Sequence, residues 1–426
     1  NGQELATHCC GYTAFRVEIT DAVTLGGENL LAVRLDTTEN PAIPPFGFVV
    51  DYLTYGGLYR EVWLDVKEKC HIEDLYITTP DLSTLKIKPT LVNPEGCILL
   101  VELLTGSHVL LKKAYTAGGS ITMDCPGVMP WDTEHPHLYT CRVSLIKIGH
   151  VMDTWESRVG FRTAEFKADG FYLNGRKTFL RGLNRHQSYP YAGYAVPEAL
   201  QREDARILKE ELGCNAVRTS HYPQSHHFID ACDRLGLLVF TEIPGWQHIG
   251  DNSWKAQAVE NTREMVLQYR NHPSIILWGV RINESQDDND FYIRTNAVAH
   301  ELDPSRATSG VRFIKQSHLY EDVYAFNDTV FIEEAADVLG GAALGAVAGH
   351  QEEGLIQGGA QILDLGGVGR TGDCTGHGIA VLALGTGGNG LVQLTHDLID
   401  GLVAHHQILQ LTGAGVGGLD QDESAL

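Results

Sequence analysis

The sequence predicts a multidomain β plus α/β protein, and three changes along the chain point to this fold class. Up to about residue 162, short runs alternate apolar and polar residues, which predicts antiparallel strands. From about residue 163 to 330, strands alternate with helices, which indicates βαβ units and a parallel sheet. After residue 330 the composition becomes rich in glycine and acidic residues.

The first segment, residues 1–67, carries period-two runs separated by glycine-rich turns such as Gly26-Gly27. Alternation of this kind is typical of a β-sandwich in which one face of each sheet is buried. The expected strands are Ala14–Ile19, Asn29–Leu35 and Tyr59–Leu64.

Residues 68–162 continue in the same style. Several short strands at regular spacing predict a second β-sandwich, immunoglobulin-like in topology, which serves as scaffold. Its strands are expected at His71–Thr78, Lys86–Val92, Cys97–Leu104 and Tyr139–Lys147.

Residues 163–330 predict the first five to six strands of a (β/α)8 barrel, which needs eight to close. The barrel is therefore expected to be incomplete. The expected strands are Thr178–Gly182, Asn215–Arg218, Leu237–Thr241, Ile275–Val280, Ala307–Val311 and Asp322–Phe326, and the expected helices are Pro197–Leu212, His226–Leu235, Trp254–Tyr269 and Phe291–Leu302.

The last segment, residues 331–426, differs from everything before it. It holds nearly half of the chain's 46 glycines, and Arg370 is its only Lys or Arg. It also carries half of the net charge of -22. This composition predicts a poorly structured tail of unknown origin, arising from a frameshift, a gene-prediction error or a fusion.

The composition also limits which classes of binding partner are expected. A net charge of -22 argues against nucleic acid or an anionic membrane surface, because both require clustered Lys and Arg. The sequence has no apolar run long enough to span a membrane and no signal peptide at Asn1. Nine cysteines without a CxxC pair indicate reduced thiols and a cytoplasmic protein.

An apolar run from Pro273 to Ile282 ends in the pair Asn283-Glu284. The run predicts a buried strand that presents a carboxyl group at its C-terminal end, where parallel barrels place their chemistry. The stretch Trp278-Gly279-x-Arg281-x-Asn283-Glu284-Ser285 resembles the acid/base motif of glycoside hydrolase family 2. Three upstream stretches resemble earlier barrel strands of that family, in the right order: Arg181-Gly182-Leu183-Asn184-Arg185-His186, Val217-Arg218-Thr219-Ser220-His221-Tyr222-Pro223 and Phe240-Thr241-Glu242-Ile243-Pro244.

The resemblance covers residues 1–330 and implies a domain plan and a reaction. Residues 1–67 would be the C-terminal half of a sugar-binding jelly roll, followed by the immunoglobulin-like sandwich and the TIM barrel. The family cleaves β-glycosides with a pair of carboxyl groups. A retaining β-galactosidase with a carbohydrate substrate, no cofactor and a homo-oligomeric state is therefore expected.

The resemblance also assigns roles to individual residues. Glu284 would be the acid/base group, and Asn283 would bind the sugar 2-hydroxyl. Arg181 would hold the carboxylate of the nucleophile by charge-assisted bonds. Trp246 aligns where family members that bind magnesium carry an acidic residue, so no metal site is expected. The remaining expected pocket residues are Asn184, His186, His221, Tyr222, Glu242 and Trp246.

The nucleophile of the family has no counterpart after Phe326, because no Ser/Thr-Glu-Tyr setting follows a strand there. Hydrolysis is therefore expected to be impaired. Two alternatives stay open: an inactive carbohydrate-binding relic, and specificity for β-glucuronides. A remote third is dinucleotide binding by the tail, since Gly385-Thr386-Gly387-Gly388-Asn389-Gly390 follows an apolar run and fits GxGxxG.

Overall fold

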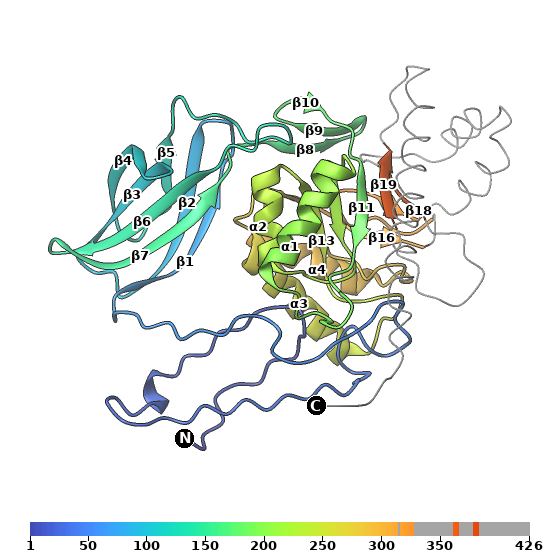
Figure 1. Ribbon diagram of the computed structural model, residues 1–426, viewed down its shortest axis with the longest axis horizontal. Coiled ribbons are helices and arrows are strands. Elements are labelled where there is room, and N and C mark those ends of the chain that lie inside the picture. The colour runs from blue at the N-terminus through green and yellow to red at the C-terminus, as the bar shows by residue number, and fades with distance from the viewer. Residues whose placement is uncertain (314–315, 328–360, 366–377, 383–426) are drawn as a thin grey trace, which may run out of the picture. The chain divides into compact units, whose positions relative to one another are not determined.

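The computed structural model describes residues 1–313, 316–327, 361–365 and 378–382. It contains a β-sandwich followed by a partial parallel α/β region of the TIM-barrel type (Figure 1). None of the helices in these ranges has both the length and the apolar character that a bilayer span requires.

The sandwich consists of two antiparallel sheets, with strand orders β1-β2-β5 and β4-β3-β6-β7. Apolar residues alternate along these strands and fill the space between the sheets, where Leu75, Leu99 and Val143 are fully buried. This confirms the four strands expected between residues 71 and 147. The strands are β1 (His71–Thr78), β2 (Thr84–Val92), β3 (Cys97–Thr105), β4 (His108–Thr116), β5 (Ile121–Asp124), β6 (Tyr139–Lys147) and β7 (His150–Val159).

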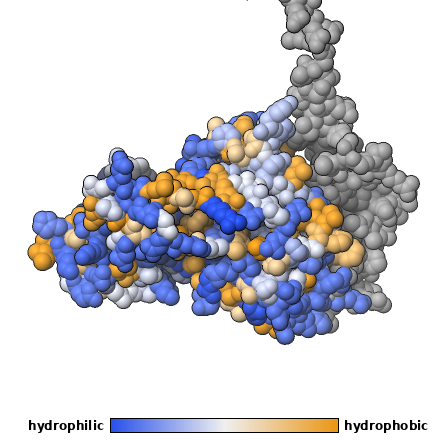
Figure 2. Space-filling view, turned by 90° about the horizontal axis from the view of Figure 1, so that it is seen from below, coloured by the Kyte–Doolittle hydropathy of each residue, from blue (hydrophilic) through white to orange (hydrophobic). Residues whose placement is uncertain are grey.

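The three strands expected in residues 1–67 are not formed, and that prediction is wrong. The only regular element before β1 is a short 3-10 turn, η1 (Thr20–Ala22). Alternation fixes which side chains share a face, but a strand also needs a neighbour to complete its ladder of hydrogen bonds, and the described residues provide none here. Apolar side chains such as Leu25, Val62 and Trp63 are consequently exposed, and Figure 2 shows apolar and polar residues mixed over one face.

Five parallel strands form the sheet of the barrel region, in the order β11-β12-β13-β14-β15. A short antiparallel sheet of β8 (Ala164–Lys167), β9 (Gly170–Leu173) and β10 (Arg176–Lys177) precedes it, and β16 pairs in parallel with β17. The remaining strands are β11 (Gly182–Arg185), β12 (Ala216–Thr219), β13 (Leu238–Glu242), β14 (Ile275–Gly279), β15 (Ala307–Ser309), β16 (Val311–Arg312) and β17 (Ala325–Phe326).

The first strand of this sheet begins later than the expected Thr178–Gly182. The Asn215 side chain holds residues 179 to 181: its carboxamide donates to the Phe179 carbonyl at 2.7 Å and accepts from the Arg181 backbone amide at 2.7 Å. The Arg181 carbonyl also accepts from the backbone amides of Asn215 and Ala216, both at 3.0 Å. The parallel ladder starts at Gly182, where an added Cβ would lie 2.4 Å from the Ala216 carbonyl oxygen. Close approach of the two strands therefore requires glycine at this position.

Four α-helices among the described residues alternate with these strands, and Figure 1 shows them packed beside the sheet. Side chains cap their N-termini: Ser225 accepts from the His227 amide in α2, Asp251 accepts from the Trp254 amide in α3, and Asp288 caps α4. Gly236 ends α2 with φ 70°, a left-handed conformation that glycine adopts without strain. The helices are α1 (Glu198–Arg206), which continues into the π-helical turn η2 (Ile207–Glu211), α2 (His226–Leu235), α3 (Asn252–Tyr269) and α4 (Asn289–Leu302).

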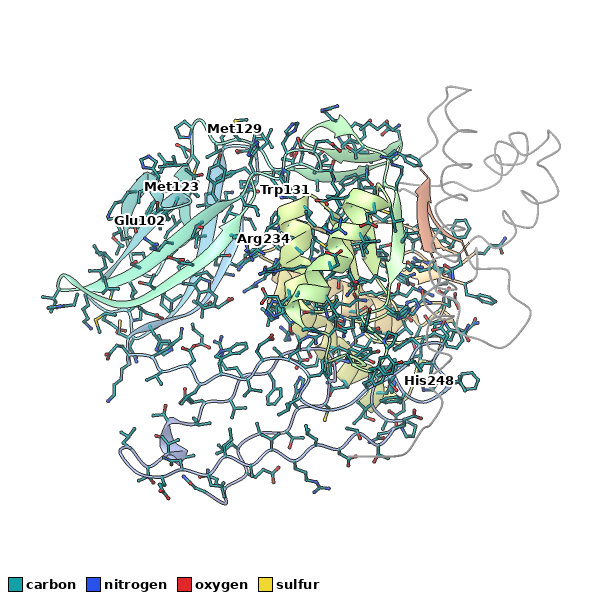
Figure 3. The ribbon with its side chains drawn as sticks, in the orientation of Figure 1. Glu102, Met123, Met129, Trp131, Arg234 and His248 are labelled. Carbon is teal, nitrogen blue, oxygen red and sulfur yellow. The ribbon has the colours of Figure 1, made fainter. Side chains whose placement is uncertain are left out.

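Buried polar contacts join the sandwich to the barrel region. Trp131, which Figure 3 shows beside helix α2, donates its indole N–H to the Asp233 carbonyl at 2.8 Å. Asp303 accepts hydrogen bonds from Tyr76 at 2.7 Å and from the Trp278 indole at 3.0 Å. Arg306 donates to the same carboxylate at 2.6 Å, so one fully buried acid joins residues of both domains.

The Asp303 carboxylate is expected to make the free energy of unfolding depend on pH in the acid range. Burial raises its pKa, but Arg306 and the hydrogen bonds from Ser305 and Tyr76 outweigh burial and lower the pKa from 3.8 to about 2. A depressed folded-state pKa stabilises the fold above the unfolded value, so this contribution, roughly 2 kcal/mol, is lost as the pH falls from about 4 to about 2. Urea unfolding between about pH 5 and about pH 2 should therefore show a shallower pH dependence in Asp303→Asn and an intermediate one in Tyr76→Phe. Parallel curves for all three proteins would contradict this assignment.

The region after residue 327 is described only as β18 (Gln361–Leu365) and β19 (Gly378–Leu382), an antiparallel pair. The glycine motif Gly385–Gly390 and most of the expected tail lie outside the described residues. None of the eight cysteines among the described residues is in a disulfide.

Candidate active site

The parallel register places the C-terminal ends of three strands at one edge of the sheet. Thr219 of β12 pairs with Thr241 of β13, and Glu242 of β13 pairs with Gly279 of β14. The residues that follow these ends, His221 after β12 and Glu284 after β14, therefore meet at the edge where barrels bind ligands.

A buried polar cluster lies at this edge. Arg218 donates from Nε to Glu242 Oε2 at 2.9 Å and from Nη2 to Asn283 Oδ1 at 2.6 Å. His221 Nδ1 lies 2.7 Å from Glu242 Oε1. All four side chains are at least nine-tenths buried. Three neighbouring strands are thus tied together by one guanidinium, and the Asn283 carboxamide is fixed in orientation.

The cluster holds a buried anion. Burial raises the pKa of Glu242, but the positive charge of Arg218 and the hydrogen bond from His221 outweigh burial, so the pKa lies below its ordinary value. A carboxylate accepts hydrogen bonds only, so His221 Nδ1 is the donor in their contact. Glu242 therefore stays ionised at neutral pH and serves as an anchor for Arg218 and His221.

Glu284 differs from Glu242 in both exposure and contacts. It is half-buried, and its carboxylate accepts from Gln247 Nε2 at 3.1 Å and from the Asn327 carboxamide. Its backbone amide donates to the Val311 carbonyl at 2.9 Å. Among the described residues, amides supply both side-chain contacts of this carboxylate, and no ion pair with it is formed.

The backbone at Glu284 is in the left-handed region, with φ 54°, and that of Gln247 is too, with φ 57°. Non-glycine residues in this region cost about 1–3 kcal/mol and gather at functional sites. The side chains of these two strained residues are hydrogen-bonded to each other, so the loop after β13 and the segment after β14 are held together at this point.

The loop after β13 covers this unit. The Gln247 amide donates to the Asn283 carbonyl at 2.7 Å, and the half-buried Trp246 forms a parallel bridge with Asn283. His248 packs edge-on against Trp254, with ring centroids 5.7 Å apart, and is labelled in Figure 3. A cavity of about 290 Å³ opens beside it, lined by Phe48, Gln247, His248, Ile249 and Gln286.

His186 and Tyr222 form the other side of the cluster. His186 Nδ1 lies 3.2 Å from the Tyr222 hydroxyl, and the rings of His186 and His221 pack edge-on at 5.4 Å. Tyr52, from the N-terminal segment, packs against both histidines at 5.5 and 5.8 Å. Asn184 lies in β11, opposite Arg218 of β12.

Arg181 is the expected site residue that the structure places elsewhere. It precedes the first residue of β11, so it lies at the amino end of the sheet, opposite the edge that carries Glu242 and Glu284. Its side chain is exposed, and its charge acts on Lys209 and Cys214. The guanidinium in contact with a carboxylate at the site is that of Arg218.

Sequence reasoning missed Arg218, Gln247, Asn327 and Tyr52 as site residues. For Arg218 a signal was present, because a charged residue inside an apolar strand must find a partner when it is buried. Gln247, Asn327 and Tyr52 lie in loops or extended segments, and their sequence neighbourhood carries no such signal.

The chain is similar to known proteins in both its domains. Residues 164–335 match the model described as glycosyl hydrolases family 2, TIM barrel domain, and residues 70–162 match the model described as glycosyl hydrolases family 2. A β-galactosidase of Thermoanaerobacter pseudethanolicus is 47% identical over 351 residues, which cover 78% of this chain and 46% of the relative. A putative β-glucuronidase of Formosa agariphila is 35% identical over 352 residues, covering 75% of this chain and 42% of the relative.

Solved structures are similar as well. A putative β-galactosidase from Bacteroides fragilis superposes with a TM-score of 0.67 at 28% identity, covering 77% of this chain and 53% of that one. Bacteroides uniformis β-glucuronidase 2 superposes with a TM-score of 0.68 at 27% identity, covering 80% and 48%. The chain spans about half the length of the curated relatives that it matches. On this evidence the chain belongs to glycosyl hydrolases family 2.

Proposed function

We propose that this chain carries the acid/base half of a retaining β-galactosidase site, with Glu284 as the proton donor and with hydrolysis impaired. The observation that supports this most strongly is the position of Glu284. It follows β14 at the C-terminal edge of the sheet and is half-buried, and among the described residues its carboxylate accepts from amide side chains. A carboxyl group so placed can give a proton to a leaving oxygen and later take one from water.

Asn283 complements Glu284 in this proposal by binding the sugar 2-hydroxyl. Arg218 occupies its carboxamide oxygen at 2.6 Å, which turns the amide nitrogen into the group available as a donor. Glu242 stabilises Arg218 in that role. His186, His221 and Tyr222 line the pocket in the same proposal, and Trp246 offers an aromatic face to the sugar ring.

The impairment concerns the second carboxyl group. In a retaining enzyme the two groups stand about 5 Å apart. Among the described residues, the side-chain contacts of Glu284 are with amides, and Glu242 is bound by Arg218 and His221. Glu333, Glu334, Glu352 and Glu353 lie outside the described residues. A carbohydrate-binding relic built on the same pocket is the alternative.

β-Galactosides are the proposed substrates because three of the similar curated proteins, at 40% to 47% identity, carry the name β-galactosidase. β-Glucuronides are the second candidate, since several similar solved structures are β-glucuronidases, at 27% to 31% identity. The substrate is thus a neutral or an acidic sugar joined by a β-glycosidic bond.

The domain plan and setting belong to the same proposal. Residues 1–67 correspond to the C-terminal half of a sugar-binding jelly roll, 68–162 to an immunoglobulin-like sandwich, 163–330 to the first strands of a TIM barrel, and 331–426 to an unrelated tail. The protein is a cytoplasmic homo-oligomer that needs no cofactor and no metal for the reaction.

The test is release of nitrophenol from nitrophenyl β-galactoside by the purified chain, beside Glu284→Ala and a β-glucuronide control. We expect a rate close to that of Glu284→Ala, together with calorimetric binding of a non-hydrolysable thiogalactoside in preference to a thioglucuronide. Full turnover that Glu284→Ala abolishes would show that the residues after 330 supply the second carboxylate. Preference for the glucuronide would overturn the substrate assignment.

A further inference from the structure

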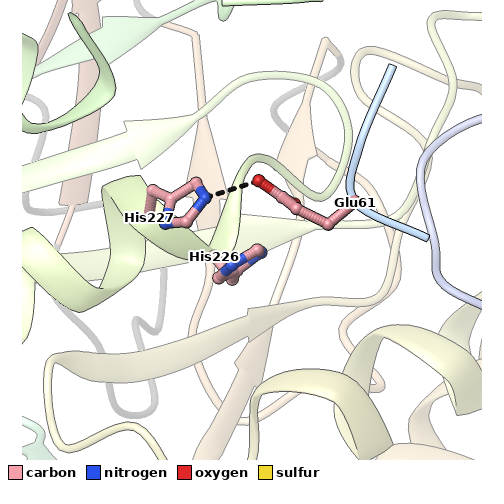
Figure 4. Close-up of side chains that lie close together, drawn as sticks. All are labelled: Glu61, His226 and His227. Carbon is pink, nitrogen blue, oxygen red and sulfur yellow. Dashed lines mark hydrogen bonds and ion pairs between the residues drawn. The ribbon is translucent and has the colours of Figure 1, made fainter. Parts of the chain in front are cut away.

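A second group of ligating side chains lies outside the candidate active site. Figure 4 shows Glu61, from the N-terminal segment, facing His226 and His227 at the start of helix α2. One ligand atom of each residue lies within 4.8 Å of the others. We propose that these three side chains bind a divalent transition-metal ion of the zinc class and thereby fasten the N-terminal segment to the barrel.

The donor set suits such an ion. Two imidazoles and one carboxylate are ligands that zinc takes at about 2.0–2.2 Å, with further positions left for water. In the metal-free structure His227 Nε2 lies 2.7 Å from Glu61 Oε1, and the rings of His226 and His227 are 3.9 Å apart. Glu61 is half-exposed, so its side chain can rotate to open this hydrogen bond around an ion.

A second carboxylate stands behind the cluster. His227 Nδ1 lies 3.7 Å from Glu198 Oε1, so the imidazole is placed between Glu61 on one nitrogen and Glu198 on the other. This separation is longer than a hydrogen bond, and Arg202 pairs with the same oxygen of Glu198, so Glu198 adds negative charge near the cluster and is not a direct partner of His227.

Two positive charges near the cluster would repel a cation: the partial charge at the N-terminus of α2 and the Arg60 guanidinium. The N-terminus of α2 carries a partial positive charge, which Glu61 and Glu198 counter. The Arg60 guanidinium, next in sequence, is engaged with the Tyr194 carbonyl at 2.7 Å and with Gln187 Oε1 at 2.6 Å. The guanidinium of Arg60 therefore hydrogen-bonds to the loop that contains Gln187 and Tyr194.

Comparison with the other group of potential ligands favours this one. Asp230, Asp233 and His272 also lie close together. There, however, Asp233 accepts from the Ser274 amide at 2.9 Å and pairs with His272 at 2.6 Å, while Arg158 pairs with Asp230. The Arg158 guanidinium is paired with Asp230, and both oxygens of Asp233 already accept hydrogen bonds. That group is therefore better suited to structural ion pairs than to binding a metal ion.

Binding would have a measurable effect on the fold. Glu61 and His227 are 166 residues apart in the sequence, and an ion that binds only their folded arrangement stabilises it by mass action. Zinc should therefore raise the melting temperature of the chain and slow proteolysis of residues 1–69.

The experiment is titration of the EDTA-treated full chain with zinc chloride by calorimetry and by thermal melting. We expect one site whose affinity falls at least tenfold in Glu61→Gln and in His226→Gln, while the exposed control His150→Gln binds as the parent does. Co²⁺ in place of zinc should give visible absorption bands that the Glu61→Gln/His226→Gln double variant lacks. The metal-free melting temperature and circular dichroism of each variant establish that it is folded.

Two results would overturn the proposal. One is the absence of binding heat and of any rise in melting temperature. The other is zinc affinity that the double variant retains, because the ion would then bind elsewhere on the chain.

Discussion

Azide is expected to accelerate release of phenol from phenyl β-galactoside by this chain and to yield α-galactosyl azide. The proposed site has a proton donor but no second carboxylate among the described contacts of Glu284. A small anion can occupy the face of the sugar that the nucleophile would use and attack in its place. Phenol release followed with and without azide measures the effect directly.

The leaving group separates the role of Glu284 from that of azide. Phenol leaves poorly and needs a proton, so Glu284→Gln should lower the azide-dependent rate by about 10²–10⁴. Dinitrophenol leaves without help, so the same variant should barely change its release. An equal effect on both substrates would remove Glu284 from the acid role, and rapid turnover without azide would place a nucleophile in the residues after 330.

Loss of Arg218 is expected to be the most destabilising single change in the described barrel. Arg218→Met removes the guanidinium partner of Glu242, whose side chain is 1% exposed, and leaves the buried carboxylate with only the hydrogen bond from His221 among its described side-chain partners. Breaking a buried ion pair on one side costs about 3–5 kcal/mol. Urea unfolding followed by tryptophan fluorescence measures the change, because Trp254 and Trp278 are buried in the barrel.

Two companion variants make that measurement specific. Glu242→Gln combined with Arg218→Met should recover part of the loss, since the unpaired charge is gone. Arg181→Met should change stability by less than about 0.5 kcal/mol, because Arg181 is exposed at the amino end of the sheet. Equal losses in the two arginine variants would contradict the placement of both residues.

The sequence predicted those elements whose signals are local. Helix α2 has the expected bounds, His226–Leu235, because Ser225 caps its start and Gly236 ends it in a left-handed conformation. Strands β1 and β6 also have their expected bounds, since alternation and flanking turns define each of them. The family motif singled out Glu284 and Asn283 as candidate site residues. The structure adds that Asn283 accepts a hydrogen bond from Arg218.

What the sequence could not predict depends on partners far along the chain. The alternating runs of residues 1–67 form no strands, because a ladder requires a neighbour that periodicity does not guarantee. Arg181 and Arg218 each carry a guanidinium beside a family motif. Only the parallel register, Gly182 with Ala216 and Asn184 with Arg218, shows which of them reaches the ligand edge.

The attachment of Glu284 has a consequence for the minimal length of a working fragment. Its backbone amide donates to the Val311 carbonyl and its carboxylate accepts from Asn327, so the orientation of this side chain depends on residues up to 43 positions later in the sequence. During synthesis Glu284 would emerge before the residues that orient it. Any shortened version that stops ahead of Asn327 would contain Glu284 without its complete support.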